Sequence, residues 1–208
     1  MCRNLKRFAV LVSGGGSNLQ ALIDGVEAGE IKGDLGLVVS NRKSAYGLER
    51  AKAHGIEAIY LRGDNISVEE YDKQLIEILR DRQIDFVVLG GFLKILGPDF
   101  IRAYENKIIN IHPSLIPSFC GEGYYGLRVH QAALDYGVKV SGATTHFVSE
   151  VADAGPIIYQ VSVPVLDGDQ AEDLQKRIIK EEHKLLVKTV KDYCDDKFEI
   201  QGRIVKVR

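Results

Sequence analysis

The sequence predicts an α/β protein with a mostly parallel, doubly wound sheet and antiparallel additions in its C-terminal part. Short apolar runs in the first half are continuous rather than alternating, as expected for strands that are covered on both faces. Amphipathic helical patterns lie between these runs. Such alternation of strands and helices favours a parallel sheet with right-handed crossovers.

Five strands are expected in the first half, at residues 7–12, 35–40, 58–61, 86–89 and 108–111. The clearest helix is expected at 67–82, where Ser67 and Glu70 form a capping-box pattern ahead of one apolar stripe. After residue 113 the pattern changes. We expect a loop at 113–125, a helix at 127–136, strands at 140–149 and 157–165, a long helix at 170–193 and a hairpin at 198–207.

Charge and composition exclude several classes of protein. The 208 residues include 27 Lys and Arg against 29 Asp and Glu, a net charge of −2, whereas a dedicated nucleic-acid binder usually has a basic excess. No apolar run approaches the roughly 18 residues of a membrane span. The apolar run at 8–12 is too short for a signal peptide. We therefore expect a cytoplasmic protein without a membrane or nucleic-acid partner.

The cysteines Cys2, Cys120 and Cys194 are odd in number and widely separated. They form no CxxC pair, so neither a disulfide framework nor a zinc site is expected.

A glycine-rich segment, SGGGSN at 13–18, lies directly after the first predicted strand and directly before a predicted helix. A helix N-terminus has free N–H groups and a partial positive charge, and glycine lets the backbone approach a ligand closely. Ser17 or Asn18 is placed to cap the helix and to donate to an oxyanion. The segment favours a phosphate site; a glycine-rich turn without a ligand is the alternative. It is neither GxGxxG nor GxxxxGKS, so a dinucleotide or a P-loop triphosphate is not indicated.

Asn110 and His112 end a predicted strand, within the segment NIHPSLIP. Ligands of open α/β sheets bind at the carboxyl ends of the strands, and residues two apart lie on the same side of a strand. An amide donor beside an imidazole suits oxyanion stabilisation together with proton transfer. A structural histidine with satisfied hydrogen bonds is the alternative. His146, two positions after Thr144, is expected to have at most a supporting role.

Two carboxylates are further candidates. Asp153 precedes Ala-Gly-Pro and is either a plain turn residue or the group that orients and charges a histidine. Glu182 falls on the apolar stripe of the last long helix, between Ile178 and Leu186. A carboxylate on such a stripe requires a partner. It either reaches solvent at the helix edge or contacts a ligand hydroxyl or amine.

Four segments together resemble the phosphoribosylglycinamide formyltransferase family, the glycinamide ribonucleotide transformylases of purine (IMP) biosynthesis. They are SGGGSNLQ, GGFLKIL (90–96), NIHPSLIPSF (110–119) and HFVSEVADAGPII (146–158), in the family's order and spacing. The resemblance covers roughly residues 8–190 and implies a Rossmann-like formyltransferase fold. The NIHPSL motif is shared with formyltetrahydrofolate deformylase and methionyl-tRNA formyltransferase. The glycine loop followed by Ser-Asn-Leu-Gln points to the glycinamide ribonucleotide branch.

The resemblance implies roles for particular residues. Asn110, His112 and Asp153 match the catalytic residues. The substrate phosphate and ribonucleotide would be held by Gly15, Gly16, Ser17, Asn18 and Glu182. Folate would be bound by Leu93, Lys94, Ile95 and Leu96, together with Asn110. The family's Asp-Gly-Gly is Asp-Ala-Gly here; if that position needs a positive φ, Ala154 costs about 1 kcal/mol.

The whole chain, 1–208, is therefore expected to be one formyltransferase domain. Its phosphate-binding half spans about 1–105, its folate and catalytic half about 106–195, and its terminal hairpin about 196–208. 10-Formyltetrahydrofolate is the expected co-substrate, and no metal is expected. We expect the protein to act on small-molecule substrates and to be a monomer or a homodimer.

The expected reaction moves the formyl group to the amine of glycinamide ribonucleotide. Asn110 and a protonated His112 would stabilise a tetrahedral oxyanion, while Asp153 raises the His112 pKa and positions a water that relays a proton. Two alternatives remain. One is a deformylase, in which water replaces the amine, and the other is a non-catalytic nucleotide-binding module.

Overall fold

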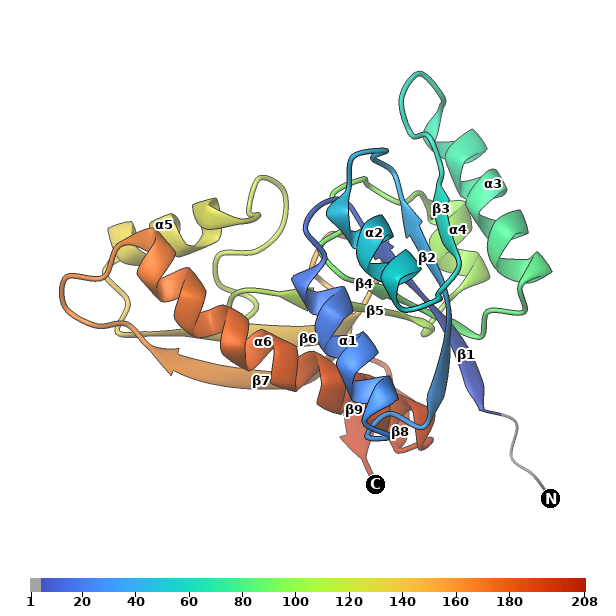
Figure 1. The fold of residues 1–208 in the computed structure, drawn as a ribbon. Helices are drawn as coiled ribbons and strands as arrows, with labels where there is room; N and C mark the ends of the chain where they lie inside the picture. The colour runs from blue at the N-terminus through green and yellow to red at the C-terminus, as the bar shows by residue number, and fades with distance from the viewer. Residues whose placement is uncertain (1–4) are drawn as a thin grey trace.

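The computed structural model describes residues 5–208, so Cys2 lies outside the described residues. Within them one nine-stranded sheet has the order β3-β2-β1-β4-β5-β6-β7-β9-β8, with helices on both faces (Figure 1). The strands are β1 (Lys6–Val12), β2 (Gly33–Ser40), β3 (Ala58–Tyr60), β4 (Phe86–Leu89), β5 (Ile108–His112), β6 (Val140–Phe147), β7 (Ile157–Pro164), β8 (Phe198–Gln201) and β9 (Ile204–Val207).

The helices form two layers, each closing one apolar core against the sheet. One layer contains α1 (Ser17–Glu27), α2 (Tyr46–Ala53), α5 (Leu127–Tyr136) and α6 (Ala171–Cys194). The other contains α3 (Val68–Asp81) and α4 (Pro98–Ala103). The doubly wound arrangement predicted from the continuous apolar runs is confirmed. Among residues 5–208 there is no helix with the length and apolar character needed to cross a lipid bilayer.

The parallel part of the sheet creates a crevice at its carboxyl edge. Strands β3, β2, β1, β4 and β5 are parallel neighbours, and the order of winding reverses between β1 and β4. Ligands of open α/β sheets bind at such a reversal. The loops that follow β1 and β4 are tied together here, because Ser13 N donates to Gly91 O (3.1 Å) and Leu93 N donates to Ser13 Oγ (2.8 Å).

The C-terminal additions are antiparallel where predicted, with one exception. Strand β6 pairs antiparallel with β5, β7 with β6, and β8 with β9. Strand β9, however, lies parallel to β7 and pairs with it at Ile157 and Ile204. At the turn of this terminal hairpin, Arg203 Nη1 donates to Ala154 O at 2.8 Å. The hairpin thus contacts the loop that carries Asp153.

Two helix starts show how far local sequence determines structure. The predicted cap of α3 is present, since Ser67 Oγ accepts from Glu70 N at 3.1 Å. The expectation that Ser17 or Asn18 caps α1 is wrong. Both residues lie inside the first turn, and the N-cap is Gly16, in the left-handed region with φ 71° and without a side-chain cap. The N–H groups of that turn are therefore not satisfied by a capping side chain.

Candidate active site

The β5–β6 pairing brings a second histidine to the predicted pair. Asn110 lies opposite His146, and His112 lies opposite Thr144. Because directly opposed residues project from the same face of a sheet, these side chains share one surface. Asn110 Nδ2 donates to His146 Nε2 at 3.1 Å. His146, expected to have at most a supporting role, contacts both Asn110 and Asp153.

Asp153 joins this cluster from the loop between β6 and β7. Its Oδ2 accepts from Gly121 N at 2.8 Å and lies 3.5 Å from His112 Nδ1. Its Oδ1 lies 3.4 Å from Asn110 Nδ2 and 3.5 Å from His146 Nε2. Side chains that are 43 residues apart in sequence therefore meet at one carboxylate.

The backbone of this loop is fixed by Asp153 and Gly155. Asp153 itself occupies the left-handed region, with φ 51°, whereas Ala154 does not. The expected cost of placing Ala154 at a positive φ therefore does not arise. A Cβ on Gly155 would lie 1.8 Å from Phe147 O, so the loop passes too close to β6 for any larger residue.

Hydrogen bonding determines which nitrogen of His112 carries the proton. Phe119 O lies 2.9 Å from Nε2, and a carbonyl only accepts, so the neutral ring holds its proton on Nε2. Nδ1 then faces the Asp153 carboxylate without a proton. A second proton, added at Nδ1, would convert that contact into an ion pair. The carboxylate is therefore placed to stabilise only the charged form of His112.

The surroundings of His112 and Asp153 shift the pKa values of both groups. Burial lowers the pKa of His112 below its ordinary value, although Asp153 and the Phe119 carbonyl act in the opposite direction. Burial therefore disfavours the protonated His112 of the sequence-based hypothesis, whereas Asp153 favours it, as that hypothesis expects. Burial acts to raise the pKa of Asp153, but His146, His112 and the Gly121 N–H together hold it below its usual range.

The Asn110 amide has two acceptors within the protein. Nδ2 donates to His146 at 3.1 Å and reaches Asp153 Oδ1 only at 3.4 Å. The longer contact is the weaker one. An oxyanion formed beside Asn110 would therefore replace Asp153 as the acceptor of that N–H. Catalytic hydrogen bonds of this kind often tighten only when the substrate is bound.

The glycine-rich loop forms a separate small cavity of about 280 Å³ at the same edge of the sheet. Its lining residues are Gly14, Gly15, Gly16, Ser17, Asn18, Arg50, Gly90 and Gly91. Asn18 Oδ1 is buried and has no hydrogen-bond partner among the described residues. The cavity combines a helix N-terminus with an arginine, which suits a small anion.

Glu182 is almost fully buried on α6. It is 7% exposed, and its carboxyl group has no hydrogen-bond or ion-pair partner within residues 5–208. Burial raises the pKa of Glu182 to about 7. This low exposure disfavours the alternative of a helix edge that reaches solvent. An unpartnered buried carboxylate is costly, which makes Glu182 a candidate for binding a ligand donor.

Residues 93–96 form part of the loop that follows β4. Leu93 and Ile95 are 51% and 78% exposed, whereas Leu96 is buried. Lys94 Nζ donates to Gly63 O at 3.2 Å and lies over the ring of Tyr71. Two exposed apolar side chains at the crevice are available to contact a flat apolar ligand.

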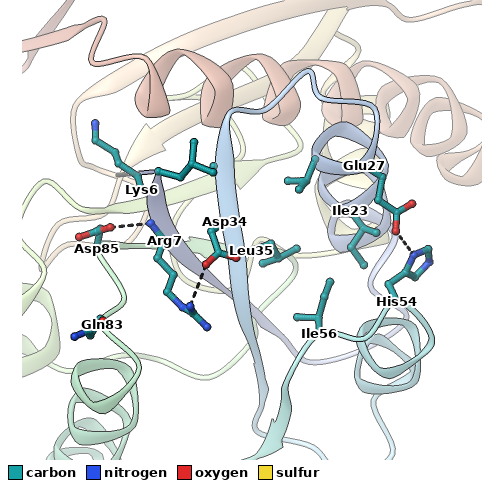
Figure 2. A pocket seen from close by; sticks show the side chains of 13 residues that line it. Lys6, Arg7, Ile23, Glu27, Asp34, Leu35, His54, Ile56, Gln83 and Asp85 are labelled. Atoms are coloured by element: carbon teal, nitrogen blue, oxygen red, sulfur yellow. Dashed lines mark hydrogen bonds and ion pairs between the residues drawn. The ribbon is translucent and has the colours of Figure 1, made fainter. Parts of the chain in front are cut away.

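A larger cavity, of about 900 Å³, lies at the opposite, amino edge of the sheet (Figure 2). Figure 2 shows the interactions of its polar groups: Arg7 forms an ion pair with Asp34, the backbone N–H of Arg7 donates to the Asp85 carboxylate, and His54 pairs with Glu27. It lies away from the Asn110 cluster. Within residues 5–208, no group of three or more His, Cys, Asp or Glu side chains is placed to hold a metal ion. Cys120 and Cys194 are free thiols.

Sequence reasoning missed Arg50 and did not place His146 beside Asn110. His146 was identifiable only from the register of the antiparallel pair, which puts it opposite Asn110. Arg50 lies on α2, and its Nε donates to Gly15 O at 2.8 Å. No local pattern around Arg50 signals this contact, because it depends on how α2 packs against the first loop.

The chain belongs to the formyl transferase family, whose model matches residues 6–190. A chloroplastic phosphoribosylglycinamide formyltransferase from Arabidopsis thaliana is 40% identical over 200 residues, covering 93% of this chain and 67% of that relative. The chain thus spans about two thirds of that relative's length. The structure of glycinamide ribonucleotide transformylase 1 from Symbiobacterium toebii is 41% identical, with a TM-score of 0.92 over 98% of this chain and 94% of that chain. A formyltetrahydrofolate deformylase from Pseudomonas syringae pv. tomato is 29% identical, with a TM-score of 0.88 over 98% of this chain and 66% of that chain.

Proposed function

We propose that this protein transfers the formyl group of 10-formyltetrahydrofolate to the amine of glycinamide ribonucleotide, a step of purine biosynthesis. The observation that carries the proposal is the pairing of two sites at one edge of the sheet. An anion-sized cavity at the N-terminus of α1 lies at the winding reversal, and the Asn110, His112 and Asp153 cluster lies at the end of the neighbouring β5. A phosphorylated acceptor suits the first site and acyl chemistry suits the second.

The acceptor is held by its phosphate and by its ribonucleotide body. The N–H groups of Gly15, Gly16, Ser17 and Asn18 bind the phosphate at the start of α1. The buried carboxylate of Glu182 accepts hydrogen bonds from the ribonucleotide, which supplies the partner that the folded chain lacks.

The folate co-substrate lies against the loop after β4. Exposed Leu93 and Ile95 contact its ring system, and backbone groups of residues 93–96 provide directional hydrogen bonds. Lys94, between these two side chains in sequence, supplies a positive charge for an anionic part of the folate. Asn110 borders both substrates.

Asn110, His112 and Asp153 then assist successive steps of the formyl transfer. The amine of the acceptor attacks the formyl carbon, and the carbonyl oxygen becomes an oxyanion that the Asn110 amide binds. His112 gains a proton at Nδ1 as negative charge develops, and Asp153 stabilises that charged ring. The proton lost by the amine passes through His112 and an ordered water to the folate nitrogen. The oxyanion then re-forms the carbonyl, and the bond between the formyl carbon and that nitrogen breaks. Holding both substrates in one cleft supplies the proximity effect.

A deformylase is the second candidate, because a protein of that name shares the fold and the chain's whole length. Water would replace the amine there. The anion cavity argues against it, since water needs no phosphate anchor. A non-catalytic nucleotide-binding module would have no use for the Asn110 cluster.

The decisive test is to supply 10-formyltetrahydrofolate with and without the acceptor. Alone, the folate should release formate slowly or not at all. Adding glycinamide ribonucleotide should start rapid consumption and give formylated product in a one-to-one ratio, because a phosphate-anchored amine has a large effective concentration over bulk water. Folate absorbance is followed while formate and product are assayed. Fast formate release that the ribonucleotide leaves unchanged would establish the deformylase instead.

A second prediction separates the two binding sites. Replacing Ser17 and Asn18 together by Ala should weaken ribonucleotide binding much more than folate binding, because the variant removes the side-chain hydroxyl and amide that can donate to an anion in this cavity. Titration calorimetry with each ligand measures both affinities. An equal loss of affinity for the two ligands would mean that the loop has only a structural role.

A further inference from the structure

Helix α2 holds two successive carbonyl groups of the glycine-rich loop. Gly47 N donates to Gly14 O at 3.0 Å, and Arg50 Nε donates to Gly15 O at 2.8 Å. In a trans peptide the carbonyl and the following N–H point in opposite directions. Carbonyls drawn towards α2 therefore leave the N–H groups of Gly15 and Gly16 pointing away from it. Within residues 5–208 neither N–H donates to an acceptor.

The Arg50 guanidinium is itself fixed in place. Besides Gly15 O, it donates from Nη1 to Gln20 Oε1 at 2.9 Å and lies over the ring of Tyr46, 4.9 Å from the ring centroid. Among the described residues no carboxylate forms an ion pair with it. One side chain thus joins α2, the loop and the first turn of α1 while its charge stays unneutralised beside the cavity.

The packing of α2 on the loop is also close. A Cβ on Gly16 would lie 2.9 Å from Gly47 Cα, and Gly16 has a φ of 71°. The loop can therefore follow this path only with glycine at position 16, and α2 packs directly against the loop. Two N–H groups from the loop and those of the first turn of α1 are left facing one anion-sized cavity.

We propose that Arg50 is the positioning residue that orients the Gly15 and Gly16 N–H groups toward the acceptor's phosphate. This inference rests on the proposed function, and it assigns to α2 a part in acceptor recognition. A lysine cannot fully replace Arg50, because one ammonium group cannot donate to both Gly15 O and Gln20 with the fixed geometry of a guanidinium.

The variants Arg50→Met and Arg50→Lys test this inference, with Lys52→Met as the matched control. Lys52 lies on the same helix, and its exposed side chain pairs with Glu49. Arg50→Met should raise the KM for glycinamide ribonucleotide by about tenfold or more, the usual effect of losing a charge-assisted hydrogen bond. The kcat and the KM for the folate should stay within about twofold, and Arg50→Lys should fall in between.

Two measurements distinguish a positioning role of Arg50 from a nonspecific disturbance of the folded structure. The first is an acceptor that lacks the phosphate, whose kcat/KM should be the same in Arg50→Met and wild type. The second is the amide NMR spectrum without substrates, in which Gly15 and Gly16 should shift in Arg50→Met but not in Lys52→Met. If Arg50→Met does not fold, Arg50→Lys is judged by the same measurements.

Several results would overturn the inference. The first is an unchanged KM for the ribonucleotide in Arg50→Met. The second is an equal loss of kcat/KM with the phosphorylated acceptor and with the acceptor that lacks the phosphate. The third is an amide spectrum in which the Gly15 and Gly16 signals do not shift. Failure of the proposed function is distinguishable, because the wild-type protein would then release formate without the ribonucleotide.

Discussion

Replacing Asp153 by Asn is expected to lower turnover at least about a hundredfold while the fold and the affinity for both substrates are kept. The physical reason lies in the proton on His112. Its Nε2–H is held by Phe119 O, so the proton that arrives during reaction must sit on Nδ1, 3.5 Å from the carboxylate. An amide at position 153 removes the charge that stabilises the imidazolium. Its N–H would donate to Nδ1 and favour the neutral ring.

The matched control for this variant is Asp167→Asn. Asp167 is a fully exposed aspartate in the loop between β7 and α6, so the same chemical change occurs far from any buried partner. Steady-state kinetics and calorimetric affinities should show normal values for the control and a loss confined to kcat for Asp153→Asn. A kcat within threefold of wild type would remove Asp153 from the mechanism.

The sequence predicts elements whose causes are local. Strand β4 begins and ends where its apolar run does, and α3 begins at a serine that caps its own first turn. Helix α4 was not predicted, because its cap comes from elsewhere. Asp72 on α3 accepts from Gly97 N at 3.2 Å and from Phe100 N at 3.3 Å. A cap supplied by a residue 25 positions away leaves no local pattern.

The same distinction applies to the candidate site. Asn110 and His112 could be placed on one face because the period of a strand is two residues. The arrival of Asp153 depends on a loop in which one non-glycine residue takes a φ of 51° and Gly155 touches β6. His146 depends on strand register, and Arg50 depends on helix packing. Contacts between elements are therefore the part of the site that a single sequence does not reveal.

Replacing Glu182 by Gln is expected to stabilise the protein at alkaline pH although it impairs acceptor binding. Burial raises the pKa of Glu182 from 4.5 to about 7 in the folded chain. Between these values the folded chain binds more protons than the unfolded chain, so the free energy of unfolding falls as pH rises. The stabilisation is complete below pH 4.5 and is lost through pH 7, for a total of about 3 kcal/mol.

A glutamine is neutral at every pH, so the variant does not lose stability through this position as pH rises. The free energy of unfolding of Glu182→Gln minus that of wild type should therefore be about 3 kcal/mol larger at pH 8 than at pH 4.5, so the variant gains relative stability as pH rises. Urea titrations at the two pH values measure it. The control is Glu181→Gln, whose carboxylate pairs at the surface with Lys184; loss of such an exposed pair should change the free energy of unfolding by less than about 1 kcal/mol.

The functional half of this prediction has the opposite sign. Under the proposed function the acceptor supplies hydrogen-bond donors to the Glu182 carboxylate, so the KM for the acceptor should fall as pH rises from 6 to 8 and the ionised form is populated. In Glu182→Gln that pH dependence should disappear and the KM should be raised throughout, while the KM for the folate is unchanged. Parallel pH dependence of stability and acceptor KM in wild type and variant would mean that Glu182 stays protonated and binds no substrate. A variant that is more stable at pH 8 and binds its acceptor less well would show that the buried carboxylate is kept for recognition at the expense of folding free energy.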